Sequence, residues 1–218
     1  MEDSTSAGVT KSYHGAAIVA SYYGHYKTID LLINKGADVN VQGGYYGTAL
    51  QAASSKGHKD IAELLINTGA NVNVRGGHYG TALQIASLNG HKDIAELLIN
   101  KGADVNAQGG YYGTALQAAS SEGHKDIAEL LISKGANVNV HGGHYGTALQ
   151  AASSNSHKDI AELLINKGAD VTVQGGVYGT AIQAARLFNH NDIVELLLGN
   201  GTTAETPSQT SVLKQIFG

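Results

Sequence analysis

The sequence predicts an all-α solenoid of six 33-residue helix-turn-helix units with loop or β-turn fingers. The motif Tyr-Gly-Thr-Ala-Leu-Gln recurs every 33 residues without insertions. A single unit of this size buries too little apolar surface to fold alone, so neighbouring units must stack. The copies begin at Tyr46, Tyr79, Tyr112, Tyr145 and, with Ile182 in place of Leu, at Tyr178. A more diverged copy, which aligns Tyr13 with Tyr46, precedes them and makes six.

The first helix of each unit is predicted to begin at the threonine of this motif. Thr48 and Gln51 form a capping-box pattern, in which each side chain satisfies a backbone N–H group that has no partner within the helix. Ala52 and Ala53 then provide a face of small residues, which lets a neighbouring helix approach closely.

A second helix is predicted from His58 to Asn67, where apolar residues recur at i, i+3 and i+4. Asp60 lies in its first turn, where the helix dipole favours a carboxylate. Gly69 is expected to end this helix in the left-handed conformation. The stretch after Asn73 is rich in glycine and asparagine and is therefore predicted to form a turn or loop.

The period predicts one repeat domain over residues 10–201, between a polar N-terminal extension, 1–9, and a tail, 202–218. Its parts are an N-terminal capping repeat (10–42), four internal repeats (43–75, 76–108, 109–141 and 142–174) and a C-terminal capping repeat (175–201). The tail has a Thr206-Pro207 start signal followed by apolar residues at helical spacing. Two interpretations stay open for the tail: a short capping helix and a disordered segment.

Charge and composition exclude several classes of function. Lys and Arg number 14 against 18 Asp and Glu, for a net charge of −4, so the basic surface that a nucleic acid requires is not expected. The absence of cysteine excludes disulfides and thiolate metal sites. No apolar run approaches the roughly 20 residues that span a bilayer. We therefore expect a cytoplasmic monomer that binds no nucleic acid, membrane or cofactor.

The repeat unit resembles the ankyrin repeat in period, order and individual residues. The resemblance covers residues 10–201 and implies an ankyrin-repeat solenoid that binds protein partners without catalysing a reaction. The matching residues of one unit are Thr48, Leu50, Ala53, Gly57, His58, Ile61, Leu64, Leu65, Gly69, Ala70, Val72 and Asn73.

Three departures from the usual ankyrin unit recur from the second copy onward. Gly43-Gly44 replaces Asp-x, Tyr46 replaces the turn glycine, and Ala49-x-Gln51 replaces Pro-x-His. This variant is similar to the C-terminal ankyrin arrays of fungal NACHT-type, NLR-like signalling ATPases. That resemblance implies that the chain is the ligand-sensing part of a larger signalling or immune-type protein.

Differences among the copies concentrate in a few columns, which flank the fingers or lie at the ends of the first helices. In ankyrin proteins the corresponding positions line the concave surface that contacts partners. Tyrosine and arginine are frequent anchors of interfaces. The candidate partner-binding residues are Gln42, Tyr45, Arg75, His78, Gln108, Tyr111, His141, His144, Gln174 and Val177 at the fingers, with Lys56, Leu88, Asn89, Glu122 and Asn155 at the helix ends.

Drift after duplication is the alternative explanation of these differences. Residues 43–75 and 109–141 differ only at the pairs Lys56/Glu122, Asn67/Ser133, Thr68/Lys134 and Arg75/His141, which indicates that the array grew by copying pairs of repeats. Near-identical copies also fit a second function, a structural spacer or a self-associating scaffold.

Catalysis and metal binding are weaker interpretations. One histidine recurs in all six copies, and six identical catalytic bases would serve no purpose, so we predict a structural role. The resemblance to ankyrin repeats implies that this histidine forms hydrogen bonds within the loops. His141 and His144 lie close in sequence, but no further ligand completes a zinc site. The recurrent tyrosine of the motif is expected to form a ladder of stacked rings. The histidine column is His25, His58, His91, His124, His157 and His190.

Overall fold

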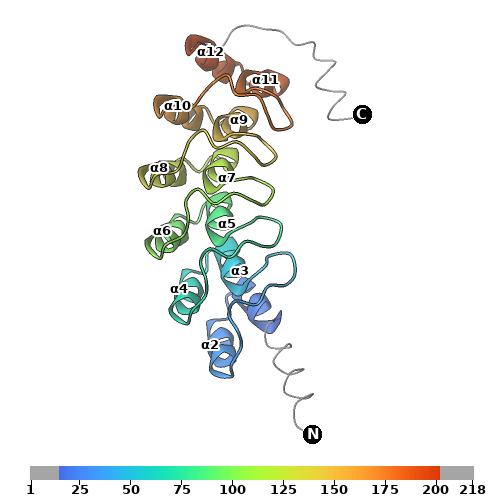
Figure 1. Cartoon of the computed structure of the whole chain (residues 1–218), viewed down its shortest axis with the longest axis vertical. Helices are drawn as coiled ribbons and strands as arrows, with labels where there is room; N and C mark the ends of the chain where they lie inside the picture. The colour runs from blue at the N-terminus through green and yellow to red at the C-terminus, as the bar shows by residue number, and fades with distance from the viewer. Residues whose placement is uncertain (1–14, 202–218) are drawn as a thin grey trace. The chain divides into compact units, whose positions relative to one another are not determined.

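The computed structural model describes residues 15–201, and the chain divides into two compact units, Met1–Gly110 and Tyr111–Gly218. Each unit consists of successive helix pairs (Figure 1). The predicted N-terminal extension, the Tyr13 copy of the motif tyrosine and the predicted tail helix lie outside the described residues.

The predicted all-α repeat class is confirmed within residues 15–201, which contain isolated β-bridges but no strand. No helix in this range is long and apolar enough to cross a membrane. Unit 1 contains a helix over 15–22, then α2 (Tyr26–Asn34), α3 (Ala49–Lys56), α4 (Lys59–Asn67), α5 (Ala82–Leu88) and α6 (Lys92–Asn100). Unit 2 contains α7 (Ala115–Glu122), α8 (Lys125–Ser133), α9 (Ala148–Ser154), α10 (Lys158–Asn166), α11 (Ala181–Leu187) and α12 (Asn191–Gly199).

The helix ends lie where the sequence predicts them. The Thr48 hydroxyl accepts a hydrogen bond from the Gln51 backbone N–H at 3.2 Å, and the Gln51 side chain accepts one from the Thr48 N–H at 2.7 Å, so the capping box is formed. Gly57 follows α3 with φ +78°, and Gly69 follows α4 with φ +100°. Glycine is favoured at both positions because side chains rarely adopt this left-handed conformation.

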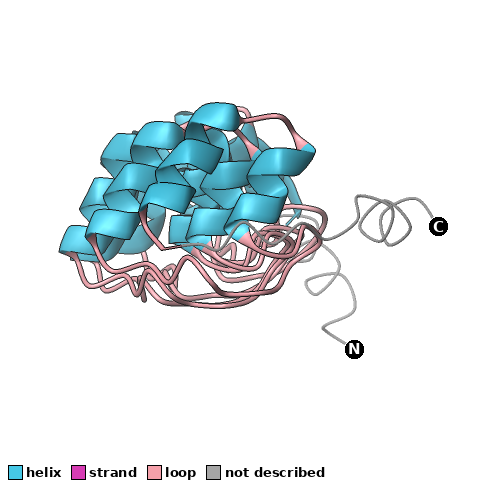
Figure 2. Cartoon of the chain, turned by 90° about the horizontal axis from the view of Figure 1, so that it is seen from above, coloured by secondary structure: helices cyan, strands magenta, loops and turns pink. Residues whose placement is uncertain are grey.

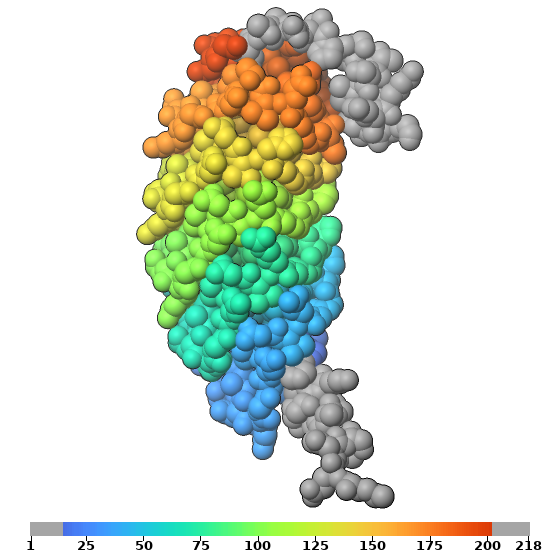
Figure 3. Space-filling view, in the orientation of Figure 1, coloured from blue at the N-terminus to red at the C-terminus, as the bar shows by residue number. Residues whose placement is uncertain are grey.

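The core lies between helices of successive repeats within each unit. The first helix α3 packs against α5, while the second helix α4 packs against both α2 and α6. In unit 2, α9 packs against α7 and α11, and α10 packs against α8 and α12. Each repeat thus forms one band of its unit's surface (Figure 3).

Small side chains on the first helices and branched ones on the second helices fill this core. Ala52, Ala53, Ile61 and Leu65 are all 0% exposed. Burying an isoleucine or leucine contributes about 1.5–3 kcal/mol. Because each such residue is covered by a neighbouring repeat, stability is shared between repeats, as the period predicts.

The fingers extend to the same side of the helices within each unit (Figure 2). Asparagines at their bases link consecutive repeats. The Asn40 side chain donates to the Gly69 carbonyl at 3.0 Å and accepts from the Asn71 N–H at 2.7 Å. These bonds satisfy backbone groups at the end of one repeat with a side chain of the repeat before it.

Candidate functional site

The fingers that begin at Gly43, Gly76, Gly142 and Gly175 are tight loops, each closed by its own glycines. The Gly43 N–H donates to the Gly47 carbonyl at 2.7 Å, and Gly47 has φ +91°. A Cβ atom at Gly77 would lie 2.6 Å from the Tyr45 carbonyl oxygen. The Gly-Gly pair, the first departure from the ankyrin pattern, therefore lets one finger lie directly against the preceding one.

Backbone hydrogen bonds hold the fingers in register. The His78 N–H donates to the Tyr45 carbonyl at 3.1 Å in unit 1. In unit 2 the His144 N–H donates to the Tyr111 carbonyl at 2.8 Å. The column that precedes the motif tyrosine is thereby aligned from one repeat to the next.

This alignment stacks a tyrosine of one finger on a histidine of the next. The ring centroids of Tyr45 and His78 are 5.5 Å apart with planes at 12°, and those of Tyr111 and His144 are 4.6 Å apart at 20°. Tyr45 remains 54% exposed and Tyr111 39% exposed. The alternation of Tyr and His along the sequence thus corresponds to a stacked pair in each unit, one face of which stays accessible.

The motif tyrosines pack against these pairs. In unit 2, Tyr145 stacks between the neighbouring motif tyrosines, 6.2 Å from Tyr112 and 6.2 Å from Tyr178, which forms the predicted ladder. In unit 1, Tyr79 instead packs edge-on against Tyr45 at 5.4 Å, and their hydroxyls share a 2.8 Å hydrogen bond. One hydroxyl therefore pairs with another tyrosine rather than with water or a loop carbonyl.

These contacts shift the ionisation of the motif tyrosines. The hydrogen bond shared with Tyr45, with burial as a second cause, raises the pKa of Tyr79 to about 12. Burial, followed by a hydrogen bond with Tyr22, raises the pKa of Tyr46 to about 12. Both rings are therefore neutral hydrogen-bonding groups at physiological pH.

Lys56 lies over the end of the first repeat's aromatic residues. Its Nζ is 4.7 Å from the centroid of the Tyr22 ring, a cation–π arrangement. Tyr22 lies 4.7 Å from Tyr46. The hydrogen bond from Tyr46 and then that from Lys56 lower the pKa of Tyr22.

The other helix-end candidates divide into two kinds. The Asn89 side chain donates to the Ile85 carbonyl at 2.8 Å, and that of Asn155 donates to the Ala151 carbonyl at 3.0 Å, so both asparagines also close their own helices. Glu122 is exposed and accepts a 3.2 Å hydrogen bond from the Ser121 hydroxyl. Leu88 is half-buried.

The finger-flanking candidates Gln42, Arg75, Gln108, His141 and Gln174 are all exposed, as is Val177. The Val177 N–H donates to the His144 carbonyl at 3.0 Å, which extends the same register. Gln42 has its side-chain oxygen against Gly76, where an added Cβ would lie 2.5 Å from it. The structure thus brings the paired finger rings of each unit together, whereas Arg75 forms no hydrogen bond or ring contact with them.

Burial lowers the pKa of His144. Its ring also packs edge-on against Tyr145 at 5.0 Å and against Tyr178 at 5.8 Å. Because none of these neighbours is charged near neutral pH, His144 presents a neutral imidazole in unit 2.

The motif glutamine has a role that the sequence did not reveal. The Gln51 side-chain amide donates to the Gly76 carbonyl at 3.0 Å and also to the Gly80 carbonyl, both in the next finger. Its oxygen serves the capping box of its own helix. Gln51 is 1% exposed, so it fixes the next finger on the helix that precedes it. The replacement of His by a recurrent Gln in the ankyrin pattern was the available signal.

The recurrent histidines bridge repeats, in line with the predicted structural role. The Nε2 atom of His58 lies 3.2 Å from the Tyr22 carbonyl oxygen, and that of His157 lies 3.1 Å from the Ser121 carbonyl oxygen. Each ring therefore engages the last turn of the preceding first helix. Among residues 15–201, no group of three or more His, Asp or Glu is placed to hold a metal ion.

Comparison with protein-family models gives one family for this chain. The model described as ankyrin repeats matches in three copies, over residues 17–109, 108–175 and 146–209. A search of curated proteins found no match.

Proposed function

The chain belongs to the ankyrin repeat family, and we propose that it is a non-catalytic recognition module that binds a protein partner through its finger tips and first-helix ends. Ankyrin repeats generally serve as protein–protein interaction modules. In this proposal the contact residues lie on the concave side, through which ankyrin proteins contact their partners.

The observation that carries the proposal is the stacked Tyr–His pair at the fingers of each unit. Tyrosine and histidine rings offer both apolar area and hydrogen-bonding groups. Because Tyr45 and His78 already hold each other in place, little side-chain entropy remains to be lost when a partner covers them. Copying of repeat pairs would by itself reproduce the ring pair in both units, so the support comes from the anchor chemistry of the exposed rings and not from their recurrence.

We further propose that this module is the ligand-sensing part of a larger cytoplasmic signalling protein. The support is the Gly-Gly-x-Tyr-Gly-x-Ala-Leu-Gln variant, which is similar to the terminal arrays of fungal NACHT-type proteins. The Gly-Gly pair and the glutamine of this variant are the residues that set the finger geometry. A longer transcript that encodes an upstream nucleotide-binding domain would test this point directly.

The proposed interface is tested by removing its rings. A variant with Tyr45, His78, Tyr111 and His144 all changed to Ala is compared with wild type in affinity capture from native lysate. The control changes Lys59 and Lys125, exposed residues of the second helices, to Ala. We expect the specific partners to be lost from the ring variant and kept by the control. Retention of every partner by the ring variant, with an unchanged circular dichroism spectrum, would refute the site.

The second candidate function, a spacer or self-associating scaffold, is favoured by the near identity of 43–75 and 109–141. Light scattering with crosslinking separates the two functions. A mass that does not change with concentration is expected for the proposed monomeric module. Regular self-pairing that the ring variant abolishes would instead support the scaffold.

A further inference from the structure

The described first helices and fingers of unit 1 carry only positively charged side chains. We call this surface the basic face, and it comprises residues 15–25, 41–58 and 74–91, which hold the first helices and fingers of unit 1. Its charged side chains are Lys56 and Arg75, and it contains no Asp or Glu. Both cations are exposed.

One of these charges lies over an aromatic ring that connects to the finger ring pair. Lys56 lies over the Tyr22 ring, and Tyr22 continues through Tyr46 to the Tyr45–His78 pair. Within the described range 15–201, neither Lys56 nor Arg75 forms an ion pair with a carboxylate. An ammonium held over a ring keeps N–H donors available to an incoming anion.

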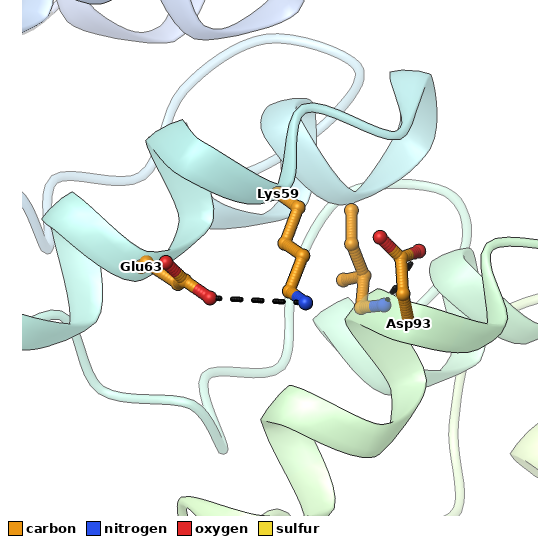
Figure 4. Close-up of polar contacts among 4 residues, drawn as sticks. Lys59, Glu63 and Asp93 are labelled. Carbon is orange, nitrogen blue, oxygen red and sulfur yellow. Dashed lines mark hydrogen bonds and ion pairs between the residues drawn. The ribbon is translucent and has the colours of Figure 1, made fainter.

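The carboxylates of these repeats lie on other elements. In the second helix α4, Lys59 and Glu63 form an exposed ion pair of 4.0 Å, and Asp93 lies nearby on α6 (Figure 4). The second helices thus carry both signs, and their charges compensate one another locally. Those carboxylates therefore belong to the second helices, and the residues of the basic face itself include none.

The equivalent elements of unit 2 are neutral. Residues 111–124, 140–157 and 173–190 carry one acidic side chain, Glu122, and one basic side chain, Arg186. Glu122 occupies the position of Lys56, and His141 occupies that of Arg75. The same ring pair therefore lies on a net positive set of elements in unit 1 and on a neutral set in unit 2.

We infer that the basic face of unit 1 binds an acidic peptide segment of the partner protein, in which apolar side chains cover the Tyr45–His78 pair while carboxylates contact Lys56 and Arg75. This inference rests on the proposed function and names the chemistry of the partner. Arginine and lysine form strong charge-assisted hydrogen bonds with carboxylates. Charge complementarity of this kind sets specificity and the association rate more than total affinity.

A peptide fits the basic face better than a nucleic acid does. Nucleic-acid binding depends on neutralising many phosphates, and it requires clustered Lys and Arg. The basic face supplies two cations, and the chain as a whole carries a net charge of −4. A short run of carboxylates needs no more than these two positive charges.

The experiment uses the whole chain and a phage-displayed library of random 16-residue peptides. The test variant, Lys56→Glu with Arg75→His, carries the residues that 109–141 has at the same positions, so the fold is expected to tolerate both. The matched control, Glu122→Lys with His141→Arg, makes the reciprocal exchange in unit 2. Melting temperatures establish that all three proteins are folded.

We expect wild type to enrich peptides rich in Asp and Glu, and the test variant to bind these peptides about tenfold or more weakly, as loss of close charge pairs predicts. The control should bind them at least as tightly as wild type. Enriched peptides without acidic bias, or acidic peptides that the test variant binds equally well, would overturn this inference and leave the proposed function intact. Tighter, Lys56- and Arg75-dependent binding of a 20-nucleotide single-stranded DNA would overturn the peptide assignment. By contrast, partner retention after removal of the four rings refutes the proposed function itself.

Discussion

Residues 43–75 and 109–141 present the same aromatic rings with different charges beside them. The stacked pair, the closing glycines and the motif glutamine are present in both units, whereas Lys56 becomes Glu122 and Arg75 becomes His141. The constant residues are those that contact the next repeat, and the exchanged charges are exposed. A repeat can therefore change its exposed charge without disturbing its stacking.

The shared residues are not bonded identically in the two units. Gln51 uses both its amide and its oxygen, while the oxygen of Gln117 has no partner within the described residues. The left-handed position after the first helix is glycine in unit 1 but includes Ser156 and Asn189 in unit 2. These contrasts predict unequal responses to the same substitution.

The largest effect is expected from Gln51→Ala. The change removes hydrogen bonds to the next finger and to the helix start, each worth about 0.5–1.5 kcal/mol, and it leaves buried partners unsatisfied, so a total cost of about 3 kcal/mol is expected. Gln117→Ala removes two amide bonds, 2.8 Å to Gly142 and 2.7 Å to Gly146, and should cost less. Urea denaturation of both variants measures the difference. Equal costs would show that the capping-box bond of Gln51 contributes nothing.

A smaller loss, about 2 kcal/mol, is expected when alanine replaces the glycine that follows the first helix. Gly57 has φ +78° and Gly123 has φ +79°, where an alanine is strained. The new Cβ would lie 2.9 Å from the His91 ring in unit 1 and 2.6 Å from the His157 ring in unit 2. Thermal unfolding should therefore show Gly123→Ala to be the more damaging of the two. The opposite order would indicate that the histidine rings move aside freely.

These two predictions depend on glycines whose role the sequence predicts and on a glutamine whose contacts with the next repeat it does not predict. The helix boundaries followed from Thr48, Gly57 and Gly69, because capping and left-handed glycine are local effects that one segment specifies. The hydrogen bonds of the Gln51 side-chain amide could not be predicted in this way, because their acceptors lie 25 and 29 residues away in another repeat. Capping rules predict where a helix starts, but they do not predict which backbone groups of another repeat the capping side chain also binds.

The candidate surface was predictable in position but not in arrangement. Variable columns identified Tyr45 and His78 as neighbours of the fingers, yet the register that stacks one on the other depends on a backbone bond between repeats. Likewise, Asn89 and Asn155 were candidate contact residues in the sequence, and in the structure they also hydrogen-bond their own helices. Their variation therefore reflects helix termination as well as any contact with a partner.

A modest gain in stability is expected from Ser156→Gly. Ser156 has φ +63°, in the column where Gly24, Gly57, Gly90 and Gly123 also have positive φ. Relief of the left-handed strain, partly offset by the greater freedom of glycine when unfolded, should stabilise unit 2 by about 0.5–1 kcal/mol. Asn189→Gly is the control, because asparagine tolerates this conformation better and should gain less. A decrease in melting temperature for Ser156→Gly would show that the backbone of Ser156 is not strained.

The smallest effect is the pH dependence that His144 gives to unit 2. Its folded-state pKa lies below the ordinary value of about 6.5 because burial disfavours the imidazolium. The unfolded chain therefore binds a proton first as the pH falls, so this contribution to stability is complete above about pH 7 and is lost between 6.5 and the lower folded pKa. The rings against it, those of Tyr111, Tyr145 and Tyr178, are uncharged throughout this range.

The variant His144→Val isolates this contribution, because valine occupies the same column at Val177. All other ionisable groups are common to the two proteins, so the difference between their stability losses from pH 7.5 to pH 5.5 belongs to His144. Wild type should lose more stability on acidification than the variant does. An identical loss in the two proteins would mean that protonation of His144 does not destabilise the folded state. The stacked pair with Tyr111 would then accommodate an imidazolium, contrary to the effect expected from burial of His144.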